Sequence, residues 1–331
     1  FVGRTGPENA ITDVPGVEVG LCTRIEARMR SGVTVIFPCG RATPGRAVAA
    51  GWFSFNGNGE MTGTHWIDDA GEFAGPIAIT NTHAVGMAHQ GLTRWMVEQL
   101  PPTGDAHWWY MPVVAETYDG VASDINALAL SEADLRAAID AAAPGPVPEG
   151  NVGGGTGMIC YEFKGGTGTA SRRVELQIGA EGGAREYTVG VLVQANFGRR
   201  EDLQILGVPV GRLWTQEALN PPGKGREMGS VIVVVATDAP LGPVALRRIA
   251  RRASFGIART GTTGGIGSGD LMLAFSTHGS RGWPLADPGD AADARDSSAP
   301  PLSDAALDTL HRATVQACEE AVINAMLAAE D

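Results

Sequence analysis

A glycine–serine pair that runs directly into a buried strand constrains this chain more than any other feature. The loop from Asn220 to Gly229 is rich in glycine and proline, and Ser230 follows it at the start of the run Val231–Val235. Such a run predicts a buried strand, and the segment before it predicts a loop. The Ser230 hydroxyl is therefore placed to attack the carbonyl of Gly229. Breaking the bond between them would give Ser230 a free α-amine, which pairs a nucleophile with a base in one residue.

The alternative interpretation is an ordinary junction between a loop and a strand. Gly229 favours the reactive interpretation, because glycine accommodates the strained backbone that an N-to-O acyl shift needs. The shift would produce an ester that water opens, leaving chains 1–229 and 230–331. The new α-amine has an ordinary pKa of about 7.7–8.0, so it could accept the hydroxyl proton near neutral pH.

Several other segments accompany this junction, and together they resemble a known family. In order from the amino terminus, the segments are Gly6–Gly16, Gly153–Met158, Val191–Gly198, Gly229–Leu241 and Ala258–Thr277. The set resembles the DmpA/BapA family of self-processing serine aminopeptidases, which act on L-amino-acid, D-alanyl and β-peptide substrates. The resemblance spans most of the chain, and its most specific parts are the Gly229–Leu241 block and the spacing from Ser230 to Ser268-Gly-Asp270.

The resemblance implies roles for three further polar residues. Ser268 and Asp270 flank a glycine, and we expect a turn that presents both side chains to the Ser230 amine, with Asp270 accepting its hydrogen bond and Ser268 orienting it. An ordinary turn before a strand at 271–275 is the alternative for that pair. Asn196 ends a predicted strand, where its amide is a candidate oxyanion donor or simply a turn residue. If Asp270 is only a turn residue, His278 is the next candidate base.

The segment from Val114 to Gly120 also resembles a family segment. Tyr118 is a candidate to support the tetrahedral intermediate, and Glu116 is a candidate partner for the free ammonium group of a substrate. Asp119 is the rival for that charge role. A packed strand end with a solvated carboxylate is the alternative for the whole segment.

The hydrophobic periodicity predicts alternating strands and helices in one layered α/β unit. Predicted strands cover 32–37, 76–80, 189–194, 231–236 and 271–275, and predicted helices cover 83–100, 131–144, 243–258 and 303–329. Segments 145–157 and 279–301 are predicted loops. The family resemblance sharpens this pattern to an αββα sandwich of the Ntn-hydrolase type. We expect residues 1–331 to form a single catalytic domain that cleaves itself into 1–229 and 230–331.

Composition limits the partners of this chain. The net charge of −12 and the absence of Lys/Arg runs argue against nucleic acid. No run of eighteen apolar residues predicts a membrane span. Gly153–Gly157 does not complete a nucleotide-binding motif, and neither the six histidines nor the four cysteines follow a metal-ligand spacing, so we expect no cofactor and no metal.

The expected substrate is a short peptide or amino-acid amide, and the resemblance implies a homo-oligomer, a tetramer of αβ units. A cytoplasmic location is favoured, with the periplasm as the alternative if a leader is removed before Phe1. Two rival functions remain at this point. One is a related amide hydrolase or acyltransferase, such as a nylon-oligomer hydrolase or an ornithine acetyltransferase. The other is an unprocessed protein that only binds amino compounds.

Overall fold

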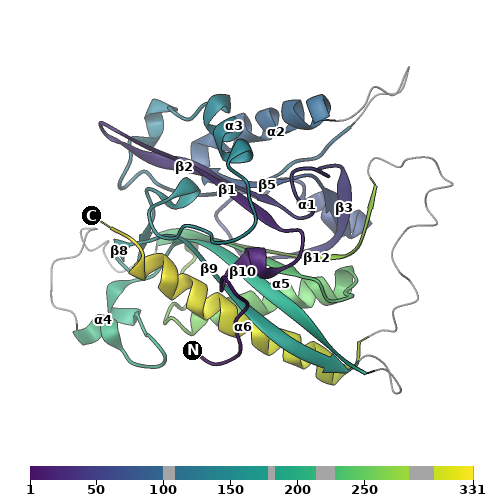
Figure 1. The fold of residues 1–331 in the computed structure, drawn as a ribbon. Helices are drawn as coiled ribbons and strands as arrows, with labels where there is room; N and C mark the ends of the chain where they lie inside the picture. The colour runs from purple at the N-terminus through teal and green to yellow at the C-terminus, as the bar shows by residue number, and fades with distance from the viewer. Residues whose placement is uncertain (100–108, 178–182, 214–227, 283–301, 331) are drawn as a thin grey trace.

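Two β-sheets lie face to face between two layers of helices (Figure 1). The structure is a computed structural model that describes residues 1–99, 109–177, 183–213, 228–282 and 302–330. The first sheet has the strand order β1 (Glu18–Glu26), β2 (Met29–Phe37), β5 (Ile77–Asn81), β6 (Val113–Thr117). The second has the order β4 (Glu72–Ala74), β3 (Arg46–Gly57), β12 (Gly267–Gly282), β11 (Met228–Thr237), β10 (Ala184–Asn196), β9 (Gly166–Gln177). A separate small hairpin pairs β7 (Ile159–Cys160) with β8 (Phe163–Lys164).

In the part of the chain that the structure describes, four longer helices cover the outer faces of the two sheets, and two short helices, α1 (Thr64–Ala70) and α4 (Val210–Leu213), lie at other positions. The longer helices are α2 (Val85–Gln99), α3 (Glu132–Asp140), α5 (Pro243–Ala258) and α6 (Asp304–Leu327). Short 3-10 turns are η1 (Ile11–Asp13), η2 (Thr82–Ala84), η3 (Ile125–Ala127), η4 (Gly153–Gly155) and η5 (Arg200–Asp202). Helices α2 and α3 pack on the four-stranded sheet, and α5 and α6 pack on the six-stranded sheet. The predicted αββα sandwich is therefore confirmed.

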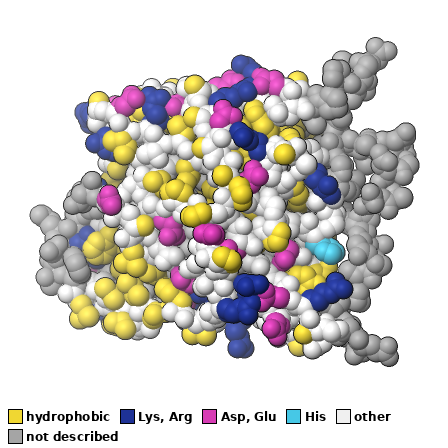
Figure 2. All heavy atoms as spheres, viewed as in Figure 1, with side chains coloured by type: hydrophobic (Ala, Val, Ile, Leu, Met, Phe, Trp, Pro, Cys, Tyr) yellow, Lys and Arg dark blue, Asp and Glu magenta, His cyan; other side chains and the backbone are white. Residues whose placement is uncertain are grey.

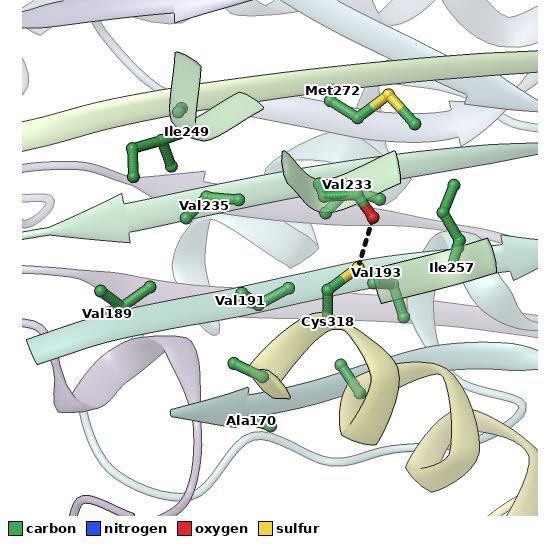
Figure 3. Packing of buried hydrophobic residues seen from close by; sticks show 14 of the residues in the cluster. Ala170, Val189, Val191, Val193, Val233, Val235, Ile249, Ile257, Met272 and Cys318 are labelled. Carbon is green, nitrogen blue, oxygen red and sulfur yellow. Dashed lines mark hydrogen bonds between the residues drawn. The ribbon is translucent and has the colours of Figure 1, made fainter. Parts of the chain in front are cut away.

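Side-chain alternation along the central strands divides the interior into layers. Along β11, Val231, Val233 and Val235 face α5 and α6, as Figure 3 shows for two of them beside β10. The intervening Ile232, Val234 and Ala236 face the other sheet. Because β11 is buried on both faces, every position of this run contributes to a core, and each Val or Ile contributes about 1.5–3 kcal/mol. This two-sided burial explains why the sequence shows a continuous apolar run.

Helix α5 (Pro243–Ala258) has the predicted bounds and is amphipathic. Leu246, Ile249 and Ala250 are buried, whereas Arg247 and Arg248 are exposed. Helix α6 crosses α5 closely, and a Cβ on Gly256 would lie 2.5 Å from the Cβ of Cys318. The Cys318 thiol donates a hydrogen bond to the carbonyl of Ala253 at 3.4 Å (Figure 3).

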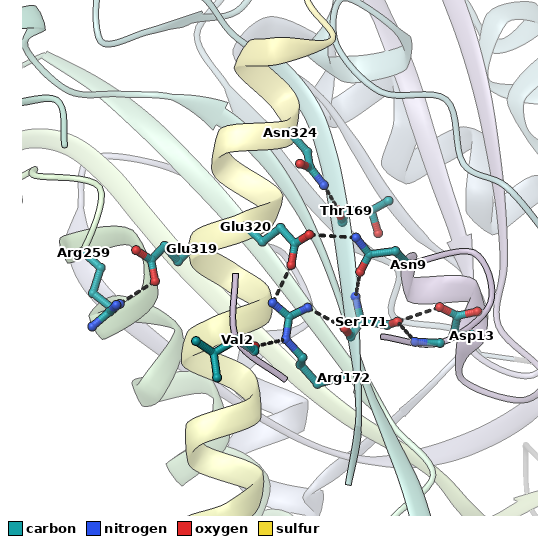
Figure 4. A network of polar contacts seen from close by, with 11 residues as sticks. Val2, Asn9, Asp13, Thr169, Ser171, Arg172, Arg259, Glu319, Glu320 and Asn324 are labelled. Atoms are coloured by element: carbon teal, nitrogen blue, oxygen red, sulfur yellow. Dashed lines mark hydrogen bonds and ion pairs between the residues drawn. The ribbon is translucent and has the colours of Figure 1, made fainter. Parts of the chain in front are cut away.

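Buried polar contacts attach the first residues of the chain to β9 and α6 (Figure 4). The guanidinium of Arg172, on β9, is 1% exposed and forms an ion pair with Glu320 of α6. It also donates to the carbonyl of Val2 at 2.8 Å, and Asn9 donates to the same Glu320 carboxylate at 2.9 Å. Pairing and hydrogen bonding compensate the cost of burying this charge. On the face shown in Figure 2, acidic and basic side chains are interspersed.

Several predicted boundaries differ from the structure. The helix beginning after Ser131 ends at Asp140, earlier than Pro144. The predicted 145–157 loop contains the short turn η4, and the predicted 83–100 helix begins as η2 before α2. The segment 267–270, predicted as a turn, is already the start of β12, which continues to Gly282. The predicted loops 220–227 and 283–301 lie outside the described residues.

None of the described helices is long and apolar enough to cross a membrane. Within the described ranges, no three His, Cys, Asp or Glu side chains gather closely enough to hold a metal ion. The four cysteines are free.

Candidate active site

Ser230 lies at the open end of the core between the two sheets. It is the third residue of β11, in the middle of the six-stranded sheet, paired with Asn196 of β10 and Gly269 of β12. Alternation along β11 places its side chain on the same face as Ile232, toward the four-stranded sheet. The residue is only 2% exposed, so substrate must reach it through a cavity.

Two N–H donors converge on the Ser230 hydroxyl. The main-chain N–H of Tyr118 donates to Oγ at 3.3 Å, and the side-chain Nδ2 of Asn196 lies 3.5 Å from it. The Asn196 amide is held in place from both ends, because its Oδ1 accepts from the N–H of Ile159 and its Nδ2 donates to the carbonyl of Tyr118, both at 2.9 Å. Oxyanions are stabilised by fixed N–H donors aimed at the place where their charge develops, and these two groups are fixed donors beside the candidate nucleophile.

The group of Tyr118 that contacts Ser230 differs from the one expected from the sequence. Its main-chain N–H, and not its phenol, bonds to Ser230. The ring folds back over Gly120, where a Cβ would lie 2.3 Å from it, and the residue is 47% exposed. The sequence therefore singled out a residue that contacts Ser230, but the contact comes from its main-chain N–H and not from its ring.

Gly229 has no room for a side chain. A Cβ at this position would lie 2.2 Å from the carbonyl oxygen of Asn196 and 2.8 Å from the Cα of Phe197. Both neighbours are main-chain atoms, at the last residue of β10 and the residue after it, and they cannot move without disturbing the sheet. Glycine at 229 thus lets β11 approach β10 closely beside the candidate nucleophile.

A buried carboxylate faces the same cavity. Glu116, at the end of β6, is 3% exposed. Its Oε1 accepts from the N–H of Glu60 at 3.0 Å, and its Oε2 accepts from the hydroxyl of Thr82. Burial raises the pKa of the Glu116 carboxyl, and these hydrogen bonds oppose the rise. A cation entering the cavity would stabilise the ionised form.

These groups enclose a single cavity of about 370 Å³. Its wall includes Thr82, Glu116, Tyr118, Asn196, Gly229 and Ser230. The arrangement places the Ser230 hydroxyl, two N–H donors and the Glu116 carboxylate around a space large enough for a small molecule. It can perform acyl transfer on a substrate that carries a positive charge.

Ser268 and Asp270 lie on the neighbouring strand, with a geometry that differs from the expected turn. Ser268 donates to Asp270 at 2.6 Å, and Asn56 donates to the other carboxylate oxygen at 2.9 Å. The register pairs Gly229 with Ser268 and Ser230 with Gly269. Since paired residues of parallel strands point to the same face, both side chains lie on the α5 side of the sheet, opposite to the Ser230 hydroxyl.

The position of Asp270 is consistent with this alternation, because it lines a different cavity of about 510 Å³ beside α5. The main chain of Ser230 nevertheless passes directly beside the Ser268–Asp270 pair, since the strands are adjacent. The expected role of the pair in holding the Ser230 amine remains a prediction.

Neither of the two rival residues is among the described residues that line the cavity. Asp119 is fully buried, where it accepts from Ser31 at 2.6 Å and from Asn81 at 3.0 Å. His278 lies nine residues beyond Gly269 on β12, a separation of about 30 Å. That distance removes His278 as the fallback base.

The residues that hold the site in place have no recognisable pattern in the sequence. Asn56 binds Asp270, whereas Glu60 and Thr82 bind Glu116. Each is separated from its partner by 34 to 214 positions. No local spacing signals such a contact.

Comparison with known proteins agrees with this geometry. Residues 9–331 match the model of peptidase family S58. The whole chain aligns at 45% identity with β-peptidyl aminopeptidase BapA of Sphingosinicella xenopeptidilytica, covering 83% of that protein. It aligns at 42% identity with BapA of Sphingosinicella microcystinivorans, covering 84%.

Solved structures show the same fold. The L-aminopeptidase D-Ala-esterase/amidase of Ochrobactrum anthropi, described as a prototype of the serine aminopeptidases and a variant of the Ntn-hydrolase fold, superposes with a TM-score of 0.88. It is 52% identical, with 100% of this chain and 89% of that chain covered. A β-aminopeptidase of a Burkholderia species gives a TM-score of 0.85 at 43% identity, covering 100% and 90%. These relatives favour an aminopeptidase over the acyltransferase and the binding protein considered from the sequence.

Proposed function

The chain belongs to peptidase family S58 and is an aminopeptidase, and we propose that Ser230 becomes its nucleophile when the Gly229–Ser230 bond is broken. The convergence of the Tyr118 N–H and the Asn196 amide on the Ser230 hydroxyl supports this proposal most directly. In maturation, Oγ attacks the Gly229 carbonyl, the C–N bond breaks, the acyl group moves to oxygen, and the hydroxyl proton passes to the departing nitrogen of Ser230. Water then hydrolyses the ester and releases chains 1–229 and 230–331.

In turnover, the freed α-amine of Ser230 takes the hydroxyl proton as Oγ attacks the substrate carbonyl. The resulting oxyanion accepts hydrogen bonds from Tyr118 and Asn196. When the intermediate collapses, the scissile C–N bond breaks and the leaving amine receives the proton from the Ser230 ammonium. A water molecule then attacks the acyl-enzyme by the same route, which returns the proton and frees the product acid.

Glu116 supplies the requirement for a free amino terminus in this proposal. Its buried carboxylate lines the cavity beside the nucleophile. An ammonium group there offsets the cost of burying the charge. The expected substrates are short peptides and amino-acid amides or esters with a free amine, including the β-peptides after which several relatives are named.

From the resemblance to the family, we also propose a homo-oligomer of αβ units. Light scattering coupled to size-exclusion chromatography tests this assembly. A monomer at working concentrations would contradict it.

Denaturing mass spectrometry tests the processing step. Wild-type protein should separate into pieces 1–229 and 230–331, whereas Ser230→Ala should remain one chain without hydrolytic activity. Ser276→Ala is the matched control, because it removes a buried hydroxyl from the adjacent strand β12, far from the cavity, and should still be cleaved. An active wild-type enzyme that stays whole after long native incubation would refute self-processing.

A further inference from the structure

A polar cavity lies next to the candidate active site and shares a wall with it. It measures about 410 Å³ and lies between the tip of the β1–β2 hairpin and segment 118–126. Tyr118 and Val121 line both this cavity and the one that contains Ser230. The two cavities therefore meet at these two residues, and we call the second one the arginine cavity.

The arginine cavity has a charge opposite to that of the active-site cavity. It is lined by Arg28 and Arg30 at the hairpin tip, with Asp124 as its acidic residue. The active-site cavity contains Glu116 and Glu162 and no basic residue among the described residues that line it. The active-site cavity is thus lined by acidic side chains, and the neighbouring arginine cavity is lined mainly by basic ones.

Arg28 is available to a ligand. It is exposed, and its guanidinium forms no hydrogen bond or ion pair with any residue that the structure describes. Arg30 is half-buried, and its Nη1 donates to the carbonyls of Ala27 at 3.0 Å and Met29 at 2.8 Å. Those bonds hold the Arg30 guanidinium at the hairpin tip and leave its remaining N–H groups without a carbonyl partner there. A guanidinium binds a carboxylate through two parallel hydrogen bonds.

We propose that the arginine cavity binds the carboxylate at the carboxy terminus of short peptide substrates, chiefly through Arg28. The inference rests on the proposed function, because it places the substrate ammonium at Glu116 and the scissile carbonyl at Ser230. Each further residue extends a chain by about 3.3–3.6 Å, so the terminal carboxylate of a di- or tripeptide lies close beyond the scissile bond. A chain with net charge −12 repels that carboxylate elsewhere, and the two arginines offset the repulsion locally.

This arrangement recognises both ends of a small peptide. The ammonium contacts Glu116, and the carboxylate contacts Arg28, with the reacting bond between them. Peptides of two or three residues with a free carboxylate would satisfy both contacts. Amides, esters and anilides of single amino acids would satisfy only the first.

Paired substrates test the inference. The kcat/KM ratio is measured for a dipeptide with a free carboxylate and for the same dipeptide as its carboxy-terminal amide. The wild-type enzyme should prefer the acid by about 3- to 10-fold, mainly through a lower KM, and added salt should reduce this preference. Arg28→Gln should bring the ratio toward one, and Arg28→Lys should retain part of it.

Arg185→Gln is the matched control, because Arg185 is an exposed arginine on β10, eleven residues before Asn196. It makes the same change of charge and should keep the wild-type ratio. An acid:amide ratio that is unchanged in Arg28→Gln, or an equal loss on both substrates, overturns the inference. Failure of the proposed function gives a different result, namely hydrolysis of both substrates by Ser230→Ala.

Discussion

Replacing Glu116 by glutamine should weaken substrate binding and at the same time stabilise the fold. The glutamine side chain has nearly the same shape, and its carbonyl oxygen can still accept the Glu60 N–H that now lies 3.0 Å from Oε1. Its NH₂ group replaces Oε2, and the Thr82 hydroxyl can rotate from donor to acceptor there. The variant therefore changes the charge and leaves the packing largely intact.

The structure sets the size of the binding effect. Glu116 is 3% exposed, so solvent screens its charge little. A hydrogen bond to a charged group typically contributes about 1.5–3 kcal/mol, which predicts a rise in KM of roughly 10- to 100-fold. Because the ammonium contact exists in both the ground state and the transition state, kcat should change little. Steady-state kinetics with a free-amine substrate measures both constants.

The stability effect has the opposite sign. Burial raises the folded-state pKa of Glu116 above its unfolded value, so the folded protein binds more protons between the two values. The stability of the wild-type protein therefore falls as pH rises from the unfolded-state pKa to the folded-state pKa of Glu116. Above the folded-state pKa, the full cost of burying the charge is present. Glutamine lacks this cost. In thermal melts from about pH 4 to about pH 8, the melting temperature of Glu116→Gln minus that of the wild type should therefore increase as pH rises.

The pH dependence of KM provides a second check. In the wild type, KM should rise as pH falls through the raised pKa of Glu116, because protonation removes the charge that binds the ammonium group. The variant should show no such rise. A wild-type KM in Glu116→Gln, or rapid cleavage of an N-acetylated substrate, would refute the assignment.

Two other substitutions test the strand junction and its neighbour. Gly229→Ala should destabilise the protein by about 1–3 kcal/mol and slow processing, because its Cβ would overlap main-chain atoms of β10. Gly57→Ala is the control, because Gly57 lies in the same sheet and a Cβ there meets nothing within 4 Å. Equal melting temperatures and equal gel patterns for the two variants would show that the close approach at Gly229 does not matter. Asp270→Asn should slow turnover roughly 10- to 100-fold, since it weakens one charged hydrogen-bond partner. Fully processed Asp270→Asn enzyme with wild-type kcat/KM would show that this carboxylate only stabilises the start of β12.

Local sequence determined the elements whose signals are strong and repeated. The 3.6-residue spacing of Leu246, Ile249 and Ala250 defined the inner face of α5. Ser303 caps α6 through a hydrogen bond from the Ala306 N–H, and serine directly before an apolar stripe is typical of a helix start. The Val231–Val235 run identified a strand buried on both faces. In each case, the residues that determine the structure are within a few positions of one another, so their composition and spacing predict it.

Tertiary structure decided which groups meet at Ser230 and which face each side chain takes. The segment Gly267–Asp270 has the composition of a turn, but β11 and β3 pair with β12 on both sides, and their ladder hydrogen bonds make this segment a strand. The two-residue period then directs Asp270 away from the Ser230 hydroxyl, which turn chemistry alone could not show. The Tyr118 N–H reaches Ser230 from 112 residues away because the two sheets lie face to face. Every residue except proline has a main-chain N–H, so the sequence cannot indicate which one contacts Ser230, and only the packing of the sheets identifies it.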